Sequence, residues 1–287
     1  MLWALLSILS GIGDAFGFAL MKKLKGTNSS VVVWVQYAFA LPFLLAFLYF
    51  NYPQKISIDV YWVMVLNGTL LLISTYLLIK ATQMSNLSVS MPMLSLTPLF
   101  LILTSYIMIN ELPTFYGFLG IFLIVVGTYA IHIKNYKDGF LEPFKALAKD
   151  KGSVYAIAVA FIWSITANLF KSGIMGSNPI FYVFAVYLFI SIIMLPLAFI
   201  KFKEKIVEIK INFNILILLG VLSAFIAATA AYAMSVAIAS YVIALKRSSV
   251  IFSVALGFIL FKEKGFKQAI IGATIMFIGT ALIAIPQ

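Results

Sequence analysis

The chain repeats itself at a fixed spacing. Identical residues recur at an offset of 152 residues: Gly68 and Gly220, Ala81 and Ala233, Ser88 and Ser240, Phe100 and Phe252, Glu111 and Glu263, Gly120 and Gly272, Gly127 and Gly279, and Thr128 and Thr280. Nearer the start the offset is 150, where Gly26 and Asn28 fall on Gly176 and Asn178. The chain is therefore two copies of one unit. We place the copies at residues 1–133 and 154–287, joined by a linker at 134–153.

The composition indicates a polytopic membrane protein of the all-α class. Of the 287 residues, 63% are hydrophobic and 10% are charged, which is too few charges for the surface of a soluble domain of this size. A helix needs about 20 apolar residues to cross a bilayer, and its backbone groups must be paired internally. Ten segments qualify, at 2–21, 31–50, 60–79, 89–109, 114–133, 154–174, 180–200, 213–233, 237–260 and 266–285. We therefore predict ten transmembrane helices.

Each copy holds five predicted spans, and five is odd. A tandem copy of an odd-span unit enters the membrane upside down relative to the first copy. Inverted repeats of this kind are typical of secondary transporters, which hold their substrate near the bilayer midplane at the repeat interface. In the linker, Phe140 and Phe144 favour a short amphipathic helix at the membrane interface.

Lysine placement predicts the orientation. The odd-numbered loops between spans carry 15 lysines, whereas the even-numbered loops carry Lys55 and, at a span end, Lys171. The positive-inside rule then puts the odd loops in the cytoplasm and both termini outside. Because most of the lysines lie in these loops, the net charge of +11 does not indicate a nucleic-acid partner.

A family pattern lies at the end of each copy. It comprises Ser88 to Pro92, Pro98, Glu111 and Gly120 to Gly127 in the first copy, and Ser240 to Lys246-Arg247, Glu263 and Gly272 to Gly279 in the second. This duplicated set resembles the EamA-type repeat of the drug/metabolite transporter superfamily. The resemblance implies a carrier whose central cavity is lined by spans 1, 3, 4, 6, 8 and 9. It also implies two cytoplasmic termini, opposite to the lysine count. The basic pair is similar to one that holds an anionic group in triose-phosphate and nucleotide-sugar translocators.

Three charged residues inside predicted spans are the first candidates for the site. Lys246 and Arg247 lie about ten residues into the ninth span, and Asp14 lies well inside the first. An ionised group at a helix centre costs roughly 2.5–3.5 kcal/mol, so it usually has a function. The cations could bind a carboxylate or phosphate, and Asp14 could carry a proton or bind an amine. The alternatives are that Asp14 forms a structural ion pair with Lys246 or Arg247, or that the cations bind a lipid headgroup.

Polar and aromatic residues supply further candidates for substrate binding. In the sixth span Trp163 precedes a stripe that contains Ser164 and Asn168, which suits a polar ligand or hydrogen bonds between helices. Tyr76 of the third span and Tyr232 of the eighth lie nearer helix ends, where snorkelling or gating is the alternative role.

Two prolines of the fourth span, Pro92 and Pro98, are candidates for a hinge. Each removes one helix hydrogen bond, which favours a bending point for alternating access. A static kink, satisfied by neighbouring helices, is the alternative.

The sequence predicts a transporter and no enzyme. It contains no cysteine, its single histidine, His132, lies at a span end, and it lacks a metal-binding cluster or a glycine-rich phosphate loop. We expect a secondary transporter, exporter or exchanger of amino acids or other carboxylate- or phosphate-bearing metabolites in the cytoplasmic membrane.

Its expected partners are the small-molecule substrate and membrane lipids, and no cofactor or metal is expected. A coupling proton or other ion, and a monomer or a homodimer, stay open. The rivals are a flippase of lipid-linked substrates, an intramembrane enzyme of lipid metabolism and an ion channel.

Overall fold

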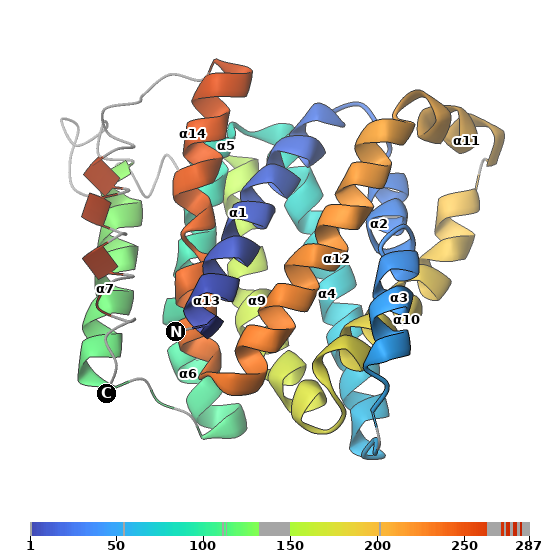
Figure 1. Cartoon of the computed structure of the whole chain (residues 1–287). Helices are drawn as coiled ribbons and strands as arrows, with labels where there is room; N and C mark the ends of the chain where they lie inside the picture. Colours follow the sequence, from blue (N-terminus) through green and yellow to red (C-terminus); the bar gives the residue numbers. More distant parts are fainter. Residues whose placement is uncertain are drawn as a thin grey trace.

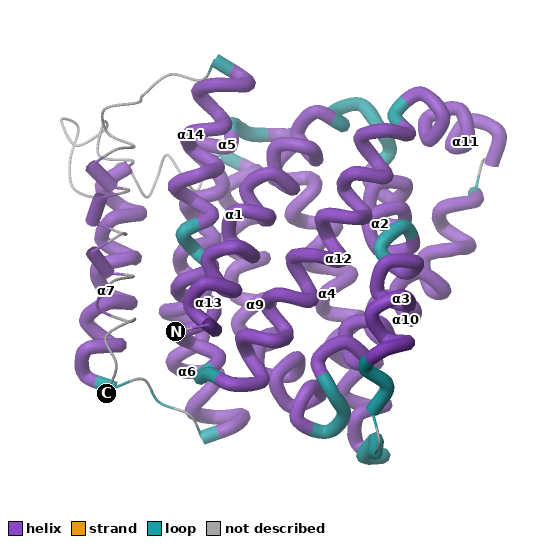
Figure 2. The backbone as a smooth tube through the Cα atoms, viewed as in Figure 1, coloured by secondary structure: helices purple, strands orange, loops and turns teal. Residues whose placement is uncertain are grey.

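The computed structural model describes residues 2–53, 55–110, 112, 114–131, 150–200 and 202–262, and near the end residues 271–272, 274–275, 278–279 and 282. In these residues every regular element is helical, and no strand occurs (Figure 2). Seven segments are long and apolar enough to cross a membrane, and two shorter apolar helices, Thr97–Ile109 and Phe115–Gly127, accompany them. The described chain is thus an all-helical integral membrane protein.

In the first half of the chain, successive helices run through the bundle one after another (Figure 1). Its elements are α1 (Leu2–Lys23), α2 (Ser29–Ala38), α3 (Leu41–Phe50), α4 (Asp59–Met84), α5 (Leu87–Ser90), the 3₁₀ helix η1 (Met91–Leu96), α6 (Thr97–Ile109) and α7 (Phe115–Ile131). The second pass consists of α2 and α3, and the fourth consists of α5, η1 and α6.

The second half repeats four of these passes and adds a surface helix. Its elements are α9 (Lys151–Met175), α10 (Pro179–Phe199), α11 (Phe202–Ile211), α12 (Phe213–Val236), α13 (Ala239–Lys246) and α14 (Ser249–Phe261). The sequence did not predict α11, because its charged residues were read as a loop. It lies at one end of the bundle, beside the beginning of α12 (Figure 1).

Some sequence predictions fall on residues that are not described. They are the interfacial helix predicted around Phe140 and Phe144 in the linker, His132, and most of the tenth span at 266–285. Nine of the ten predicted spans therefore correspond to described helices, and the tenth stays a prediction.

The repeated asparagines have the same structural role in both halves. Asn28 caps α2, where its side chain accepts a hydrogen bond from the Ser30 amide at 3.0 Å. Asn178 caps α10 and accepts from the Phe181 amide at 2.7 Å. Asparagine at this position satisfies an amide that would lack a partner in the first helical turn. The duplication therefore reproduces local backbone geometry as well as hydrophobicity.

Each half packs one of its helices against the other half in the same way, and we call this arrangement the exchanged packing. By the sequence offsets, α1 corresponds to α9 and α4 corresponds to α12; α1 packs along α12, and α9 packs along α4. A Cβ atom on Gly220 of α12 would lie 2.5 Å from Cβ of Phe39, and one on Gly68 of α4 would lie 2.5 Å from Cδ1 of Phe189. Gly220 and Gly68 are equivalent, as are Phe39 and Phe189. The same close contact is thus made twice, each time between helices of different halves.

Hydrogen bonds at the two ends of the bundle show which helix termini lie together. At one end, the Asn28 amide donates to Oε2 of Glu208 at 2.9 Å, and Ser85 Oγ donates to Oδ1 of Asp150 at 2.6 Å. At the other end, the Ser57 amide donates to the Gly176 carbonyl at 2.9 Å. We call the first the basic end, since it carries the lysines of the last turn of α1, Lys22 and Lys23.

Equivalent helices run in opposite directions between these ends. α1 ends at the basic end with Lys22 and Lys23, whereas α9 begins there after Asp150 and ends at Gly176. α4 likewise runs toward the basic end and α12 away from it. This relation between the halves fits an inverted repeat.

Both copies interrupt their fourth pass at the same place. In the first copy, η1 covers Met91–Leu96 between α5 and α6. The equivalent stretch, 243–248, is where α13 gives way to α14. Pro92 lies in the first turn of η1 and Pro98 in the first turn of α6, where a missing amide hydrogen costs little. The prolines therefore mark segment starts, and their hinge role stays a prediction.

Candidate functional site

The interruption in the second copy places two cations beside α1. Lys246 ends α13 and Arg247 follows it, and a Cβ atom on Gly11 of α1 would lie 2.7 Å from the Lys246 carbonyl oxygen. Because only glycine permits this approach, Asp14, one turn further along α1, lies opposite the lysine. Its Oδ2 atom is 3.3 Å from Nζ of Lys246. The two residues thus form a largely buried ion pair between α1 and the end of α13.

Arg247 is also buried, but no carboxylate is paired with it as Asp14 is paired with Lys246. Only 1% of the residue is exposed, and its guanidinium lies 4.9 Å from the ring centroid of Trp163 on α9. Within the described residues, its Nε and Nη1 atoms have no hydrogen-bond partner. A cation gains from an aromatic face, but buried donors without acceptors cost free energy. The guanidinium therefore holds unsatisfied donors at the edge of an adjoining space, which Arg247 helps to line.

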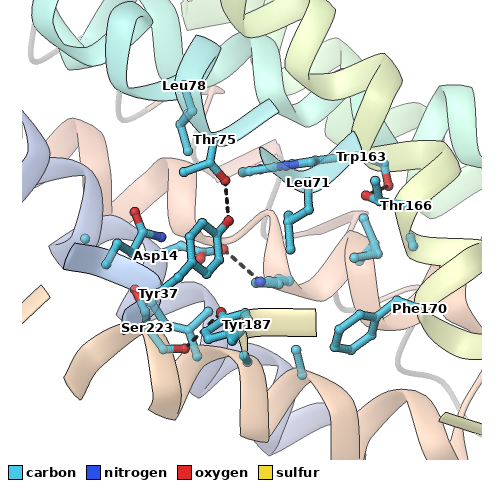
Figure 3. A pocket seen from close by; sticks show the side chains of 18 of the residues that line it. Asp14, Tyr37, Leu71, Thr75, Leu78, Trp163, Thr166, Phe170, Tyr187 and Ser223 are labelled. Atoms are coloured by element: carbon cyan, nitrogen blue, oxygen red, sulfur yellow. Dashed lines mark hydrogen bonds and ion pairs between the residues drawn. The ribbon is translucent and has the colours of Figure 1, made fainter. Parts of the chain in front are cut away.

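That space is a cavity between the two halves of the protein (Figure 3). It measures about 970 Å³, including the open space at its mouth. Its walls come from α1, α2, α4, α9, α10, α12 and α13, with Arg247 just beyond α13. Asp14, Lys246, Arg247 and Trp163 all line it.

Two tyrosines in equivalent positions line the cavity. Tyr37 of α2 and Tyr187 of α10 meet edge to face with ring centroids 4.7 Å apart. The hydroxyl of Tyr37 shares a short hydrogen bond with Thr75 of α4, and that of Tyr187 donates to the Ser223 carbonyl of α12 at 3.4 Å (Figure 3). The tyrosines thus connect α2 and α10 to the helices that form the exchanged packing.

Two amide oxygens in the cavity wall also lack partners among the described residues. They are Oε1 of Gln36 on α2 and Oδ1 of Asn67 on α4. The amide nitrogen of Asn67 donates to the hydroxyl of Tyr182 at 3.0 Å, which fixes the direction of its oxygen. The cavity therefore offers neutral acceptors as well as cationic donors.

Four of the eight binding residues predicted from the sequence come together in the cavity: Asp14, Trp163, Lys246 and Arg247. Ser164 and Asn168 do not line it. Asn168 accepts a hydrogen bond from Ser105 of α6 at 2.8 Å, and Thr104 donates to the Ser164 carbonyl at 3.2 Å. This polar stripe of α9 therefore joins α9 to α6, which is the packing role considered from the sequence.

Tyr76 and Tyr232 also lie outside the cavity lining. Each is 40% exposed on the surface of the bundle, and the amine of Lys80 lies 5.7 Å from the Tyr76 ring. The resemblance implied a lining from spans 1, 3, 4, 6, 8 and 9. The second and seventh spans instead contribute through α2 and α10, and the fourth does not.

Sequence reasoning missed several polar residues of the cavity wall: Gln36, Tyr37, Asn67, Thr75, Tyr187 and Ser223. Tyr37 and Tyr187 could have been found, because they coincide at the offset of 150 that aligns Asn28 with Asn178. The others have no repeated partner. In the part of the chain that the structure describes, no group of three or more His, Cys, Asp or Glu residues could hold a metal ion.

Comparison with known proteins agrees with this architecture. The model of the EamA-like transporter family matches residues 1–133 and again residues 150–285, so the two matched segments correspond to the two copies. No curated protein matches the chain significantly. One solved structure, described only as the crystal structure of a protein, is 13% identical, with a TM-score of 0.66 over 99% of this chain and 95% of the other. That likeness shows the fold alone.

Proposed function

Because the chain belongs to the EamA-like transporter family, we propose that it is a secondary transporter of small solutes that carry a carboxylate or phosphate group. Membership of the family makes it a membrane transporter of the drug/metabolite superfamily, with a small-molecule substrate and lipid contacts. The proposal adds the anionic group, the binding site and the mechanism. We place the protein in the cytoplasmic membrane, with the basic end toward the cytoplasm.

The guanidinium of Arg247 is the observation that carries this proposal. It is buried beside the cavity, it faces Trp163, and two of its nitrogens lack acceptors among the described residues. Asp14 is paired with Lys246, so it does not fully compensate the arginine. A carboxylate or phosphate beside the guanidinium would accept a hydrogen bond from an unpartnered nitrogen and neutralise the charge, and arginine is well suited to binding both groups.

Alternating access is the mechanism that we propose for movement of the bound solute. Ten membrane helices in two inverted five-helix repeats would give two related conformations, each open at one end. The exchanged packing of α1 with α12 and of α9 with α4 surrounds the cavity, so motion of one half against the other would change its access. The interruptions at η1 and at the α13–α14 junction are the positions where this motion is expected to bend the chain.

Counterflow in reconstituted vesicles tests the proposal. Vesicles containing the purified protein would be loaded with one unlabelled solute at a time, from amino acids, organic acids, sugar phosphates, nucleotides and organic cations. A labelled trace of the same solute would be added outside. We expect exchange of at least one anion-bearing solute, lost in Arg247→Gln and kept in Lys80→Gln, which changes a lysine outside the cavity. Exchange of organic cations alone would overturn the proposal.

A further inference from the structure

The charges in the cavity wall do not balance. Among the described lining residues, Lys246 and Arg247 are cations, and Asp14 is the one carboxylate. Lys246 and Asp14 are 3.3 Å apart and largely compensate each other. The surplus positive charge therefore lies on Arg247. An uncompensated buried charge is unfavourable, so a ligand that brings a single negative charge restores the balance.

The remaining wall of the cavity is mainly apolar. Large hydrophobic side chains come from several helices, among them Phe18, Leu71, Leu78, Phe170, Ile226 and Met234. Binding sites of this kind place a few polar groups for orientation and bury the rest of the ligand against hydrophobic surface. A strongly hydrated body, such as a sugar, would lose water without regaining as many hydrogen bonds.

The polar groups of the cavity wall also disfavour a ligand that carries an ammonium group. The acidic side chain that could receive it, Asp14, is held by Lys246. Among the lining acceptors that make no hydrogen bond, Oε1 of Gln36 and Oδ1 of Asn67 are neutral amides, and Oδ2 of Asp14 faces the lysine amine at 3.3 Å. The amides can accept from a hydroxyl or an amide N–H, but a zwitterion would leave the surplus positive charge of the cavity unchanged.

From these observations we infer that the cavity selects monoanions that combine one carboxylate with an apolar body and a neutral hydrogen-bond donor, and that it discriminates against zwitterions and dianions. This inference rests on the proposed function and narrows its substrate class. Arg247 binds the carboxylate, the apolar wall buries the body, and the Asp14–Lys246 pair excludes the ammonium.

A series of ligands with one common ring tests the inference. The probes are 3-phenyllactate, 3-phenylpropanoate, phenylalanine, 2-phenylethylamine and phenyl phosphate, which differ in charge around the same phenyl group. Calorimetric titration of the purified protein at neutral pH would give their dissociation constants. We expect 3-phenyllactate to bind at least about tenfold more tightly than phenylalanine, a difference of about 1.4 kcal/mol. The phosphate and the amine should bind more weakly still.

Two variants make the test specific for charge balance. Lys246→Met frees the Asp14 carboxylate and removes the surplus charge, so phenylalanine should gain relative to 3-phenyllactate. Lys80→Met removes a lysine outside the cavity and should keep the wild-type order. If Lys246→Met does not fold, Gln36→Leu tests the part of the inference that concerns the neutral donor. It should reduce the advantage of 3-phenyllactate over 3-phenylpropanoate, and an unchanged advantage would overturn the inference.

The outcomes separate this inference from the proposed function. Equal affinity for phenylalanine and 3-phenyllactate in the wild-type protein would overturn the inference, but not the carboxylate site, since both ligands carry that group. An unchanged preference in folded Lys246→Met would also overturn it. Binding of 2-phenylethylamine alone would contradict both proposals.

Discussion

The ring of Tyr37 meets the ring of Tyr187 edge to face, with centroids 4.7 Å apart, and the two residues occupy equivalent positions in the two copies of the repeat. Both are fully or nearly buried, and both lie in the wall of the cavity. Their contact therefore joins the two halves beside the proposed substrate site. Each tyrosine is held by a hydrogen bond to a helix of the exchanged packing, α4 for Tyr37 and α12 for Tyr187.

The hydrogen bond between Tyr37 and Thr75 should contribute to stability. Tyr37→Phe leaves the ring contact with Tyr187 and removes the hydroxyl, and Thr75→Val removes the other partner. In a double-mutant cycle on the free energy of unfolding, we expect a coupling of about 1 kcal/mol, which is typical of a buried hydrogen bond. Additive effects of the two substitutions would show that the hydroxyls do not depend on each other.

Glycine at position 11 should be required for the ion pair. A Cβ atom in Gly11→Ala would lie 2.7 Å from the Lys246 carbonyl oxygen, a backbone atom that cannot move without shifting the α13–α14 junction. Overpacking of this kind costs about 1–3 kcal/mol, so the melting temperature should fall.

Gly17→Ala is the matched control for that substitution on the same helix. The nearest atom to its added Cβ, Cδ1 of Ile226, would be 3.9 Å away, which is an ordinary contact. Alanine also favours the helix by roughly 0.5–1 kcal/mol over glycine. The melting temperature of this variant should stay level or rise. Equal losses in both variants would contradict the specific role of Gly11.

Asp150 should make stability depend on pH at the basic end. Partial burial raises the pKa of its carboxyl, but hydrogen bonds from Ser153 and Ser85 outweigh that effect and lower the pKa below its usual value of 3.8. The folded protein therefore binds this proton less readily than the unfolded chain. The stabilisation is present above the unfolded pKa and is lost as the pH falls through the folded pKa.

Asp150→Asn should lower the melting temperature at neutral pH, and the difference from the wild-type protein should shrink as the pH falls below about 4. Ser85→Ala, which removes one of the hydrogen bonds, should give a smaller effect of the same sign. Melting curves measured from neutral pH to about pH 3 would check both, within the range where the protein stays soluble in detergent. A difference that widens toward acid would contradict this role for Asp150.

Much of the architecture could be predicted because the repeat constrains it. Asn28 and Asn178 recur since each caps a helix, and Gly68 and Gly220 recur since each faces a phenylalanine of the other half. Hydrophobic length located the passes, but it could not show that α2 and α3 or α13 and α14 are separate helices. The breaks depend on local backbone hydrogen bonds that a hydropathy pattern does not carry.

The charged residues of the candidate site could be predicted from the sequence. Asp14, Lys246 and Arg247 could be identified because ionised groups are costly inside a membrane. The spacing of polar residues along a helix was a poorer guide to the cavity lining. Ser164 and Asn168 share one face of α9, but that face packs against α6. Which face of a helix borders the cavity depends on its packing against other helices, and one span considered alone cannot show it.

The most direct test of the central claim is the thermal stability of the protein with a panel of anions, measured for the wild-type protein and for Arg247→Gln. A ligand that binds only the folded state stabilises it, by about 2.7 kcal/mol at one hundred times its dissociation constant. The account predicts that at least one monocarboxylate raises the melting temperature of the wild-type protein and of Lys80→Gln, but not that of folded Arg247→Gln. An equal rise in Arg247→Gln would contradict the assignment of Arg247 as the residue that binds the anion.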